Sequence, residues 1–204
     1  HKKNAPQLSS IITVIGFGLG PLIGGAIAQF SEQPLVTPYL PITMAAIVSL
    51  LGLFRLKSLS FEKQPFKIAP HLELPETQFK ALFYIASFTA FCAFGSFSLF
   101  GSLAPSFIKQ AIPWHGPLIS GATIASILLI SAIVQFIAKS MNMYKALNMG
   151  LIFLLLSYLI LSICMTLHLS FLFFVSVIFL GMGHGLSLLG AFALSLVLTA
   201  CQPT

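Results

Sequence analysis

Titratable side chains are scarce in this chain, and His184 is the one that lies deepest within an apolar stretch. An imidazole donates or accepts hydrogen bonds and can carry a proton. His184 occurs in the segment GMGHGLSLLG, residues 181–190, together with Ser187. Two interpretations stay open: His184 contacts a ligand or a proton, or it hydrogen-bonds a neighbouring segment. The flanking glycines favour the second, because they let another backbone come close.

Acidic groups are confined to polar stretches of the sequence. The chain has no Asp, and its four carboxylates are Glu32, Glu62, Glu73 and Glu76. The three cysteines are widely spaced in apolar surroundings, which fits neither a disulfide framework nor a zinc site. No nucleophile with a base, no paired acids and no nucleotide-binding loop are visible. We therefore expect no enzyme, no cofactor and no metal centre. Any acid that couples the movement of protons to the function of this protein must lie outside the apolar stretches of this sequence.

The amino-acid composition indicates whether water or lipid surrounds the folded chain. Hydrophobic residues make up 57% of the 204 positions and charged residues only 7%, against about 25% charged in ordinary soluble domains. The mean hydropathy is +1.01. A soluble enzyme, a disordered chain and a nucleic-acid-binding domain are excluded. The remaining class is a polytopic membrane protein in a lipid bilayer.

Six apolar segments are long enough to cross a bilayer, which needs about 20 residues in a helix. They are residues 8–30, 36–54, 81–103, 118–138, 146–167 and 170–198. We expect Pro105 to end the third segment, and the polar interruption at 166–170 to separate the last two. Residues 55–80 form a polar linker. The predicted fold class is all-α, a transmembrane bundle of six spans.

The basic residues predict how the bundle is oriented. With six spans, both ends of the chain, the linker 55–80 and the loop 139–145 share one side, which holds nine of the ten Lys and Arg residues. Only Lys109 lies on the other side. Because Lys and Arg concentrate in cytoplasmic loops, the first side is predicted to be cytoplasmic. The net charge of +6 then needs no nucleic-acid partner.

The first apolar segment carries an unusual glycine pattern. Gly16, Gly20 and Gly24 are four residues apart, so in a helix they form one bare strip against which a second helix can pack closely. Pro21 lacks an N–H and is expected to bend the helix. Two interpretations again stay open: a moving interface between helices, or a static one.

The segment GFGLGPLIGG, residues 16–25, resembles the fifth-helix motif of the major facilitator superfamily, particularly its drug:proton antiporter branch. The matching positions are Gly16, Gly20, Pro21, Gly24 and Gly25, whereas Gln7 replaces an earlier glycine of the motif. The resemblance implies that the chain covers helices five to ten of twelve. Residues 1–54 are then the last two helices of the N-terminal half, 55–80 the central cytoplasmic loop and 81–204 the first four helices of the C-terminal half. A chain that begins with His1 fits a piece of a longer protein.

The resemblance also implies a carrier whose site lies between two halves near the bilayer midplane. The candidate cavity-lining residues are Phe94, Ser98, Gln135, His184 and Ser187. Gln135 has a second interpretation, a position near the cytoplasmic interface. The expected function is transport of a small molecule of apolar character, by export through alternating access in a bacterial inner membrane. The alternative is a non-transporting membrane subunit or scaffold with static helix packing.

Overall fold

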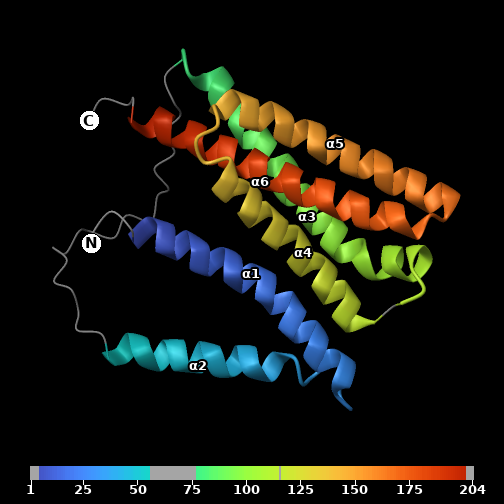
Figure 1. Ribbon diagram of the computed structural model, residues 1–204. Helices are drawn as coiled ribbons and strands as arrows, with labels where there is room; N and C mark the ends of the chain where they lie inside the picture. Colours follow the sequence, from blue (N-terminus) through green and yellow to red (C-terminus); the bar gives the residue numbers. More distant parts are fainter. Residues whose placement is uncertain (1–4, 56–76, 115, 201–204) are drawn as a thin grey trace.

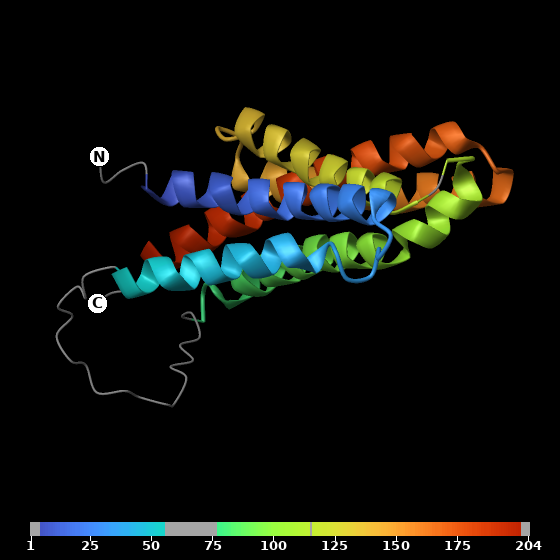
Figure 2. The ribbon, with the colours of Figure 1, turned by 90° about the horizontal axis from the view of Figure 1, so that it is seen from below.

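The computed structural model describes residues 5–55, 77–114 and 116–200, and these form six helices without a strand (Figure 1). The helices are α1 (Ala5–Phe30), α2 (Tyr39–Arg55), α3 (Lys80–Ala111), α4 (Pro117–Ile137), α5 (Met143–Leu167) and α6 (Ser170–Ala200). Figures 1 and 2 show that all six run lengthwise through the bundle, with α1 and α4 inclined to α2. The predicted all-α bundle is therefore confirmed, and the division of the last apolar stretch near 166–170 is correct.

The predicted end of the third span at Pro105 is wrong, because α3 continues through Pro105 to Ala111. Proline removes one backbone hydrogen bond and crowds the preceding turn. Here the residues on either side are held by packing, since Ala104 and Ile108 are both 0% exposed. Membrane helices tolerate a proline where neighbouring helices support the interrupted turn.

Local sequence sets the turns between the later helices. Gly116 precedes α4 with a φ of 141°, a conformation that side chains rarely adopt, and Pro117 then opens the helix. Asn142 caps α5, because its side-chain oxygen accepts a hydrogen bond from the Tyr144 backbone N–H at 2.9 Å. His168 ends α5 in the left-handed region, with a φ of 53°. These turns reverse the chain and bring α4, α5 and α6 side by side.

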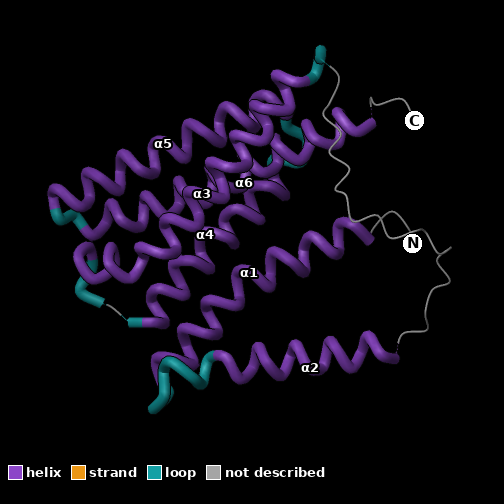
Figure 3. Tube along the Cα trace, turned by 180° about the vertical axis from the view of Figure 1, so that it is seen from behind, coloured by secondary structure: helices purple, strands orange, loops and turns teal. Residues whose placement is uncertain are grey.

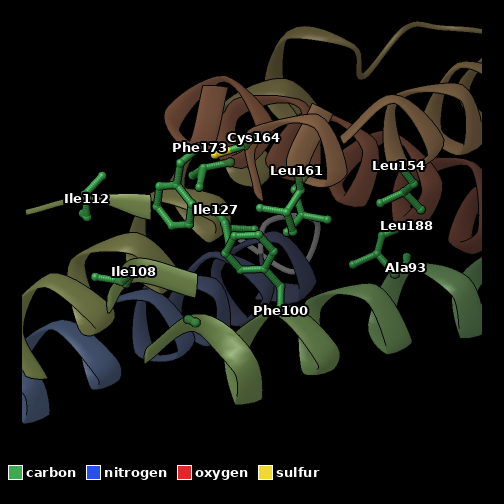
Figure 4. Packing of buried hydrophobic residues seen from close by; sticks show 13 residues of the cluster. Ala93, Phe100, Ile108, Ile112, Ile127, Leu154, Leu161, Cys164, Phe173 and Leu188 are labelled. Carbon is green, nitrogen blue, oxygen red and sulfur yellow. The ribbon is translucent and has the colours of Figure 1, made fainter. Parts of the chain in front are cut away.

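Helices α3 to α6 pack into one group around α6. Helix α6 contacts α3, α4 and α5, and its contact with α5 is the most extensive between any two helices. Figure 4 shows the centre of the group, where Phe100 of α3 lies among Ile127, Leu161 and Phe173. The Phe100 and Phe173 rings are 6.0 Å apart between centroids. This group forms the stable frame of the described chain.

Helices α1 and α2 lie outside this frame. Helix α1 packs on α4, while α2 has no buried residue and no extensive contact with any other described helix. Figure 3 shows α2 apart from α3 to α6 and joined to α1 by a turn. The predicted linker 55–80 falls mostly on residues 56–76, which lie outside the described residues.

Four of the described helices are long and apolar enough to cross a membrane: α3 through Gln110, α4, α5 and α6 through Leu194. Helix α2 and the Gly16–Phe30 part of α1 are shorter apolar helices. One end of the bundle holds the α1 start, the α2 end, the α3 start, the turn from α4 to α5 and the α6 end (Figure 1). This end therefore carries the basic residues Arg55, Lys80, Lys139 and Lys145. Lys109 lies near the other end, as the charge pattern predicts.

Candidate functional site

Helices α1 and α4 touch through their backbones. A Cβ added at Gly121 of α4 would overlap the Pro21 carbonyl oxygen of α1 and lie 3.3 Å from the Leu22 Cα. A Cβ added at Gly25 of α1 would likewise overlap the Pro117 carbonyl oxygen at the start of α4. Only glycine permits both approaches, so at these two points the helices meet backbone to backbone. Gly121 therefore lies on the face of α4 that packs against α1.

The strip of Gly16, Gly20 and Gly24 does not face α4. A Cβ added at any of the three would meet nothing within 4 Å. The contact instead uses Gly18, Pro21 and Gly25, which lie on the opposite side of the helix. Of the five motif residues, the structure therefore places Pro21 and Gly25 in the α1–α4 interface and leaves the glycine strip facing open space.

Part of this open space is a pocket of about 660 Å³ between α1, α3 and α4. Gly24, Pro21 and Gly25 line it from α1, Ser120 from α4, and Lys109 from the end of α3. Lys109 is the only charged residue among the described residues that line it. The pocket lies at the end of the bundle opposite Arg55 and Lys80.

Glycines on α6 bring this helix close to two neighbours at once, α4 on one side and α5 on the other. On the α4 side, a Cβ added at Gly185 would lie 2.6 Å from the Ser131 carbonyl oxygen. On the α5 side, a Cβ added at Gly183 would lie 2.7 Å from the Leu154 backbone nitrogen. His184 lies between these two glycines in the sequence and is therefore held deep inside the helix group.

His184 is 4% exposed and belongs to a chain of polar side chains that joins α4 and α6. Its Nδ1 lies 2.9 Å from the Ser131 Oγ. The Gln135 Nε2 donates to the same Ser131 Oγ at 3.1 Å. Gln135 and His184, named from the sequence as candidates, are thus joined through Ser131, and this arrangement also satisfies the prediction of a histidine bonded to a neighbouring helix.

Two aromatic rings of α3 lie against the imidazole. The Phe94 ring stands at 90° to it with the centroids 5.9 Å apart, and the Phe97 ring is tilted by 48° at 5.6 Å. Phe94 is 52% exposed, whereas Phe97 packs against the buried cluster. His184 therefore lies at the junction of α3, α4 and α6, with one partly open aromatic wall.

The other two candidates lie apart from this junction. Ser98 is exposed on α3. Ser187 is 0% exposed, faces Gly150 of α5, and its hydroxyl has no hydrogen-bond partner in the described structure. A Cβ added at Gly150 would lie 2.6 Å from the Ser187 backbone nitrogen, so Ser187 marks a tight contact of α5 with α6.

Sequence reasoning missed Ser131, Phe97 and Gly18. Ser131 precedes Gln135 by one helical turn, which places the two side chains on one face of α4. That spacing was a usable signal for a shared polar contact. Which histidine such a pair would meet depends on the packing of α4 against α6, and no short-range pattern gives it.

Chemically, the described residues offer a hydrogen-bonding site in apolar surroundings rather than a reaction centre. They contain no group of three or more His, Cys, Asp or Glu side chains that could hold a metal ion. The functional groups at the junction are one imidazole, one hydroxyl and one amide, next to two phenyl rings. Such a set can orient a small molecule but supplies no nucleophile with an acid partner.

A bundle of long apolar helices, closely packed through glycine and holding a buried polar junction, defines this protein as an integral membrane protein. The Major Facilitator Superfamily model matches residues 8–201. The chain belongs to this superfamily, a family of membrane transporters that carry small molecules across the lipid bilayer. Searches of curated proteins and of solved structures gave no significant match.

Proposed function

We propose that the protein exports a small molecule of apolar character by alternating access, as the antiporter-like motif at residues 16–25 suggests. In this mechanism the helices before the linker 55–80 rock against the helices after it. Residues 1–54 then belong to the N-terminal half and residues 81–204 to the C-terminal half. The basic end of the bundle faces the cytoplasm of a bacterial cell.

The α1–α4 interface carries this proposal. It is the only extensive contact between the described helices on either side of the linker. Where Gly121 and Gly25 meet the opposite backbone, no side chains interlock to resist sliding, which suits an interface that opens and closes. Helices α3 to α6 also touch through glycine, but bulky buried side chains such as Phe100 and Ile127 interlock them in addition.

The glycine strip has a place in the same mechanism. Gly16, Gly20 and Gly24 face open space in this structure, and we propose that another helix packs on them in a different state of the carrier. Replacing Gly20 by Leu then stops export without preventing membrane insertion. Normal export by the Gly20→Leu variant would contradict the assignment of the strip to a moving interface.

The alternative is a static scaffold, and a disulfide between the two helices distinguishes the two functions. A Cβ added at Gly18 lies 3.8 Å from the Leu128 Cβ, which is the mean Cβ separation in protein disulfides. The double variant Gly18→Cys, Leu128→Cys, with the native cysteines replaced, should cross-link on oxidation. Its single-cysteine variants are the matched controls.

The assay measures efflux of 9-fluorenone, a neutral aromatic ketone, from cells that express the double variant, before and after oxidation and again after reduction. Rocking of the two halves predicts that oxidation stops efflux and that reduction restores it. Efflux that continues unchanged in the fully cross-linked protein would mean that α1 and α4 stay together during transport. No efflux of any tested compound by the reduced wild-type protein would favour the scaffold.

A further inference from the structure

The hydrogen bonds at the α3–α4–α6 junction have a direction. The Gln135 amide donates to the Ser131 Oγ, whose own single proton must then go elsewhere. The other partner of this hydroxyl in the described structure is the His184 Nδ1. If Nδ1–H donated to Ser131, both the Ser131 proton and the Nε2 lone pair would lack a partner, whereas donation from Ser131 to Nδ1 leaves only the Nε2–H unpaired. The second arrangement is favoured, and in it neutral His184 carries its proton on Nε2. Gln135 and Ser131 together fix the imidazole tautomer.

The Nε2–H that results is a buried donor without an acceptor. His184 Nε2 has no hydrogen-bond partner in the described structure, although the residue is 4% exposed. A buried donor left unpaired costs about 1–3 kcal/mol, and such groups are rare in native proteins. Residues 81–200 contain no Asp or Glu, so no carboxylate from α3 to α6 can reach this donor.

We propose that the His184 Nε2–H is the hydrogen-bond donor for the transported molecule, and that the Phe94 and Phe97 rings hold its apolar body. This inference rests on the proposed transport function and names its substrate class: neutral aromatic molecules that carry a carbonyl or ether oxygen. Such a molecule supplies the missing acceptor and covers both rings. Ser131 and Gln135 are positioning residues, because they act through the imidazole.

Access to the donor comes from the Phe94 side. Phe94 is 52% exposed and stands at the edge of the junction, whereas Phe97 is packed against the buried cluster. Because Phe94 is half exposed and lies outside the buried cluster, rotation of its ring is the motion that the proposal requires to uncover the Nε2–H. An incoming aromatic ring replaces the edge contact that Phe94 makes with the imidazole.

The test compares two probes that differ in one group, 9-fluorenone with a carbonyl and fluorene without it. Their affinities for the purified intact protein in detergent are measured by equilibrium binding. A hydrogen bond to a buried donor predicts about tenfold tighter binding of fluorenone. In His184→Leu this ratio should fall to about one, and His184→Gln, which keeps an N–H donor, should restore part of it.

The positioning role of Ser131 is tested with a matched serine on the same helix. Ser131→Ala frees the imidazole to adopt either tautomer, so the fluorenone-to-fluorene ratio should fall several-fold while fluorene affinity stays constant. Ser126→Ala removes a hydroxyl that bonds only the Ala122 carbonyl of its own helix, at 2.8 Å. The ratio in Ser126→Ala should equal that of the wild-type protein.

Nitrogen NMR of histidine-labelled protein checks the tautomer directly, with His184→Leu used to assign the signal. The proposal requires a proton on Nε2 and none on Nδ1. A proton on Nδ1, equal affinities for the two probes, or a ratio unchanged in His184→Leu would each overturn it. Absence of efflux together with a retained ratio would instead overturn the transport function and leave the donor site standing.

Discussion

Adding one methyl group at Gly121 should separate α1 from α4. In Gly121→Ala the new Cβ would overlap the Pro21 carbonyl oxygen and lie 2.9 Å from the Pro21 carbonyl carbon. Non-bonded carbons pack at about 3.5–4.0 Å, so the helices must move apart here by at least about 0.6 Å. All three atoms nearest to the new Cβ belong to the backbone of Pro21 and Leu22, so no side chain can rotate away to relieve the overlap.

Overpacking of this kind costs about 1–3 kcal/mol. The equilibrium constant between the packed and the separated α1–α4 arrangements should therefore shift by about 5- to 150-fold toward separation. The assay is the rate of disulfide formation between Gly18→Cys and Leu128→Cys, which should decrease by up to this factor when Gly121→Ala is added. Gly24→Ala is the matched control, because its Cβ meets nothing within 4 Å.

Two results would refute this reasoning. One is a cross-linking rate in Gly121→Ala equal to that of the parent pair, which would mean that α1 does not pack on Gly121. The other is an equal slowing in Gly24→Ala, which would mean that any added methyl group on these helices slows the reaction. Membrane insertion is monitored in each variant by its yield in the membrane fraction.

Three further predictions concern the stability of the α3–α6 group, each measured by thermal unfolding of the purified protein in detergent. Phe100→Ala should destabilise it by about 3 kcal/mol, because Phe100 is 0% exposed, whereas Phe91→Ala, at a residue 71% exposed, should cost far less. Tyr158→Phe should cost about 0.6–1 kcal/mol through loss of the hydrogen bond to the Ser96 carbonyl oxygen, 3.0 Å long. Gly185→Ala should cost about 1–3 kcal/mol, since its Cβ would press on the α4 backbone. An unchanged melting temperature in Phe100→Ala, Tyr158→Phe or Gly185→Ala would contradict the packing described for that residue.

The helices themselves follow from the sequence, because apolar length and the positions of polar interruptions are local properties. His168 marks the turn between α5 and α6 even within an almost continuous apolar stretch. Pro105 misleads because the rule that proline ends a helix holds for a helix in water. At Pro105 the burial of Ala104 and Ile108 keeps the helix intact.

Which face of a helix forms a contact could not be predicted from the glycine spacing. Gly16, Gly20 and Gly24 form the more regular strip, yet α4 packs on the side of Gly18 and Gly25. A bare strip makes close approach possible, but the partner's shape decides where it occurs.

The sequence predicted two residues of the candidate site, but it did not predict the hydrogen bonds that join them. His184 and Gln135 stand out because polar side chains are rare in these apolar segments, and their rarity is visible in the sequence alone. Their connection runs through Ser131, which resembles many other serines until α4 and α6 are packed. Since Gly185 sets how closely these helices approach, and Ser131 lies directly opposite it, the same glycine that brings the two backbones together also brings the hydroxyl to the imidazole. The polar junction is therefore a consequence of close helix packing, which explains why a hydrogen-bonded histidine can be buried in a segment with no charged partner.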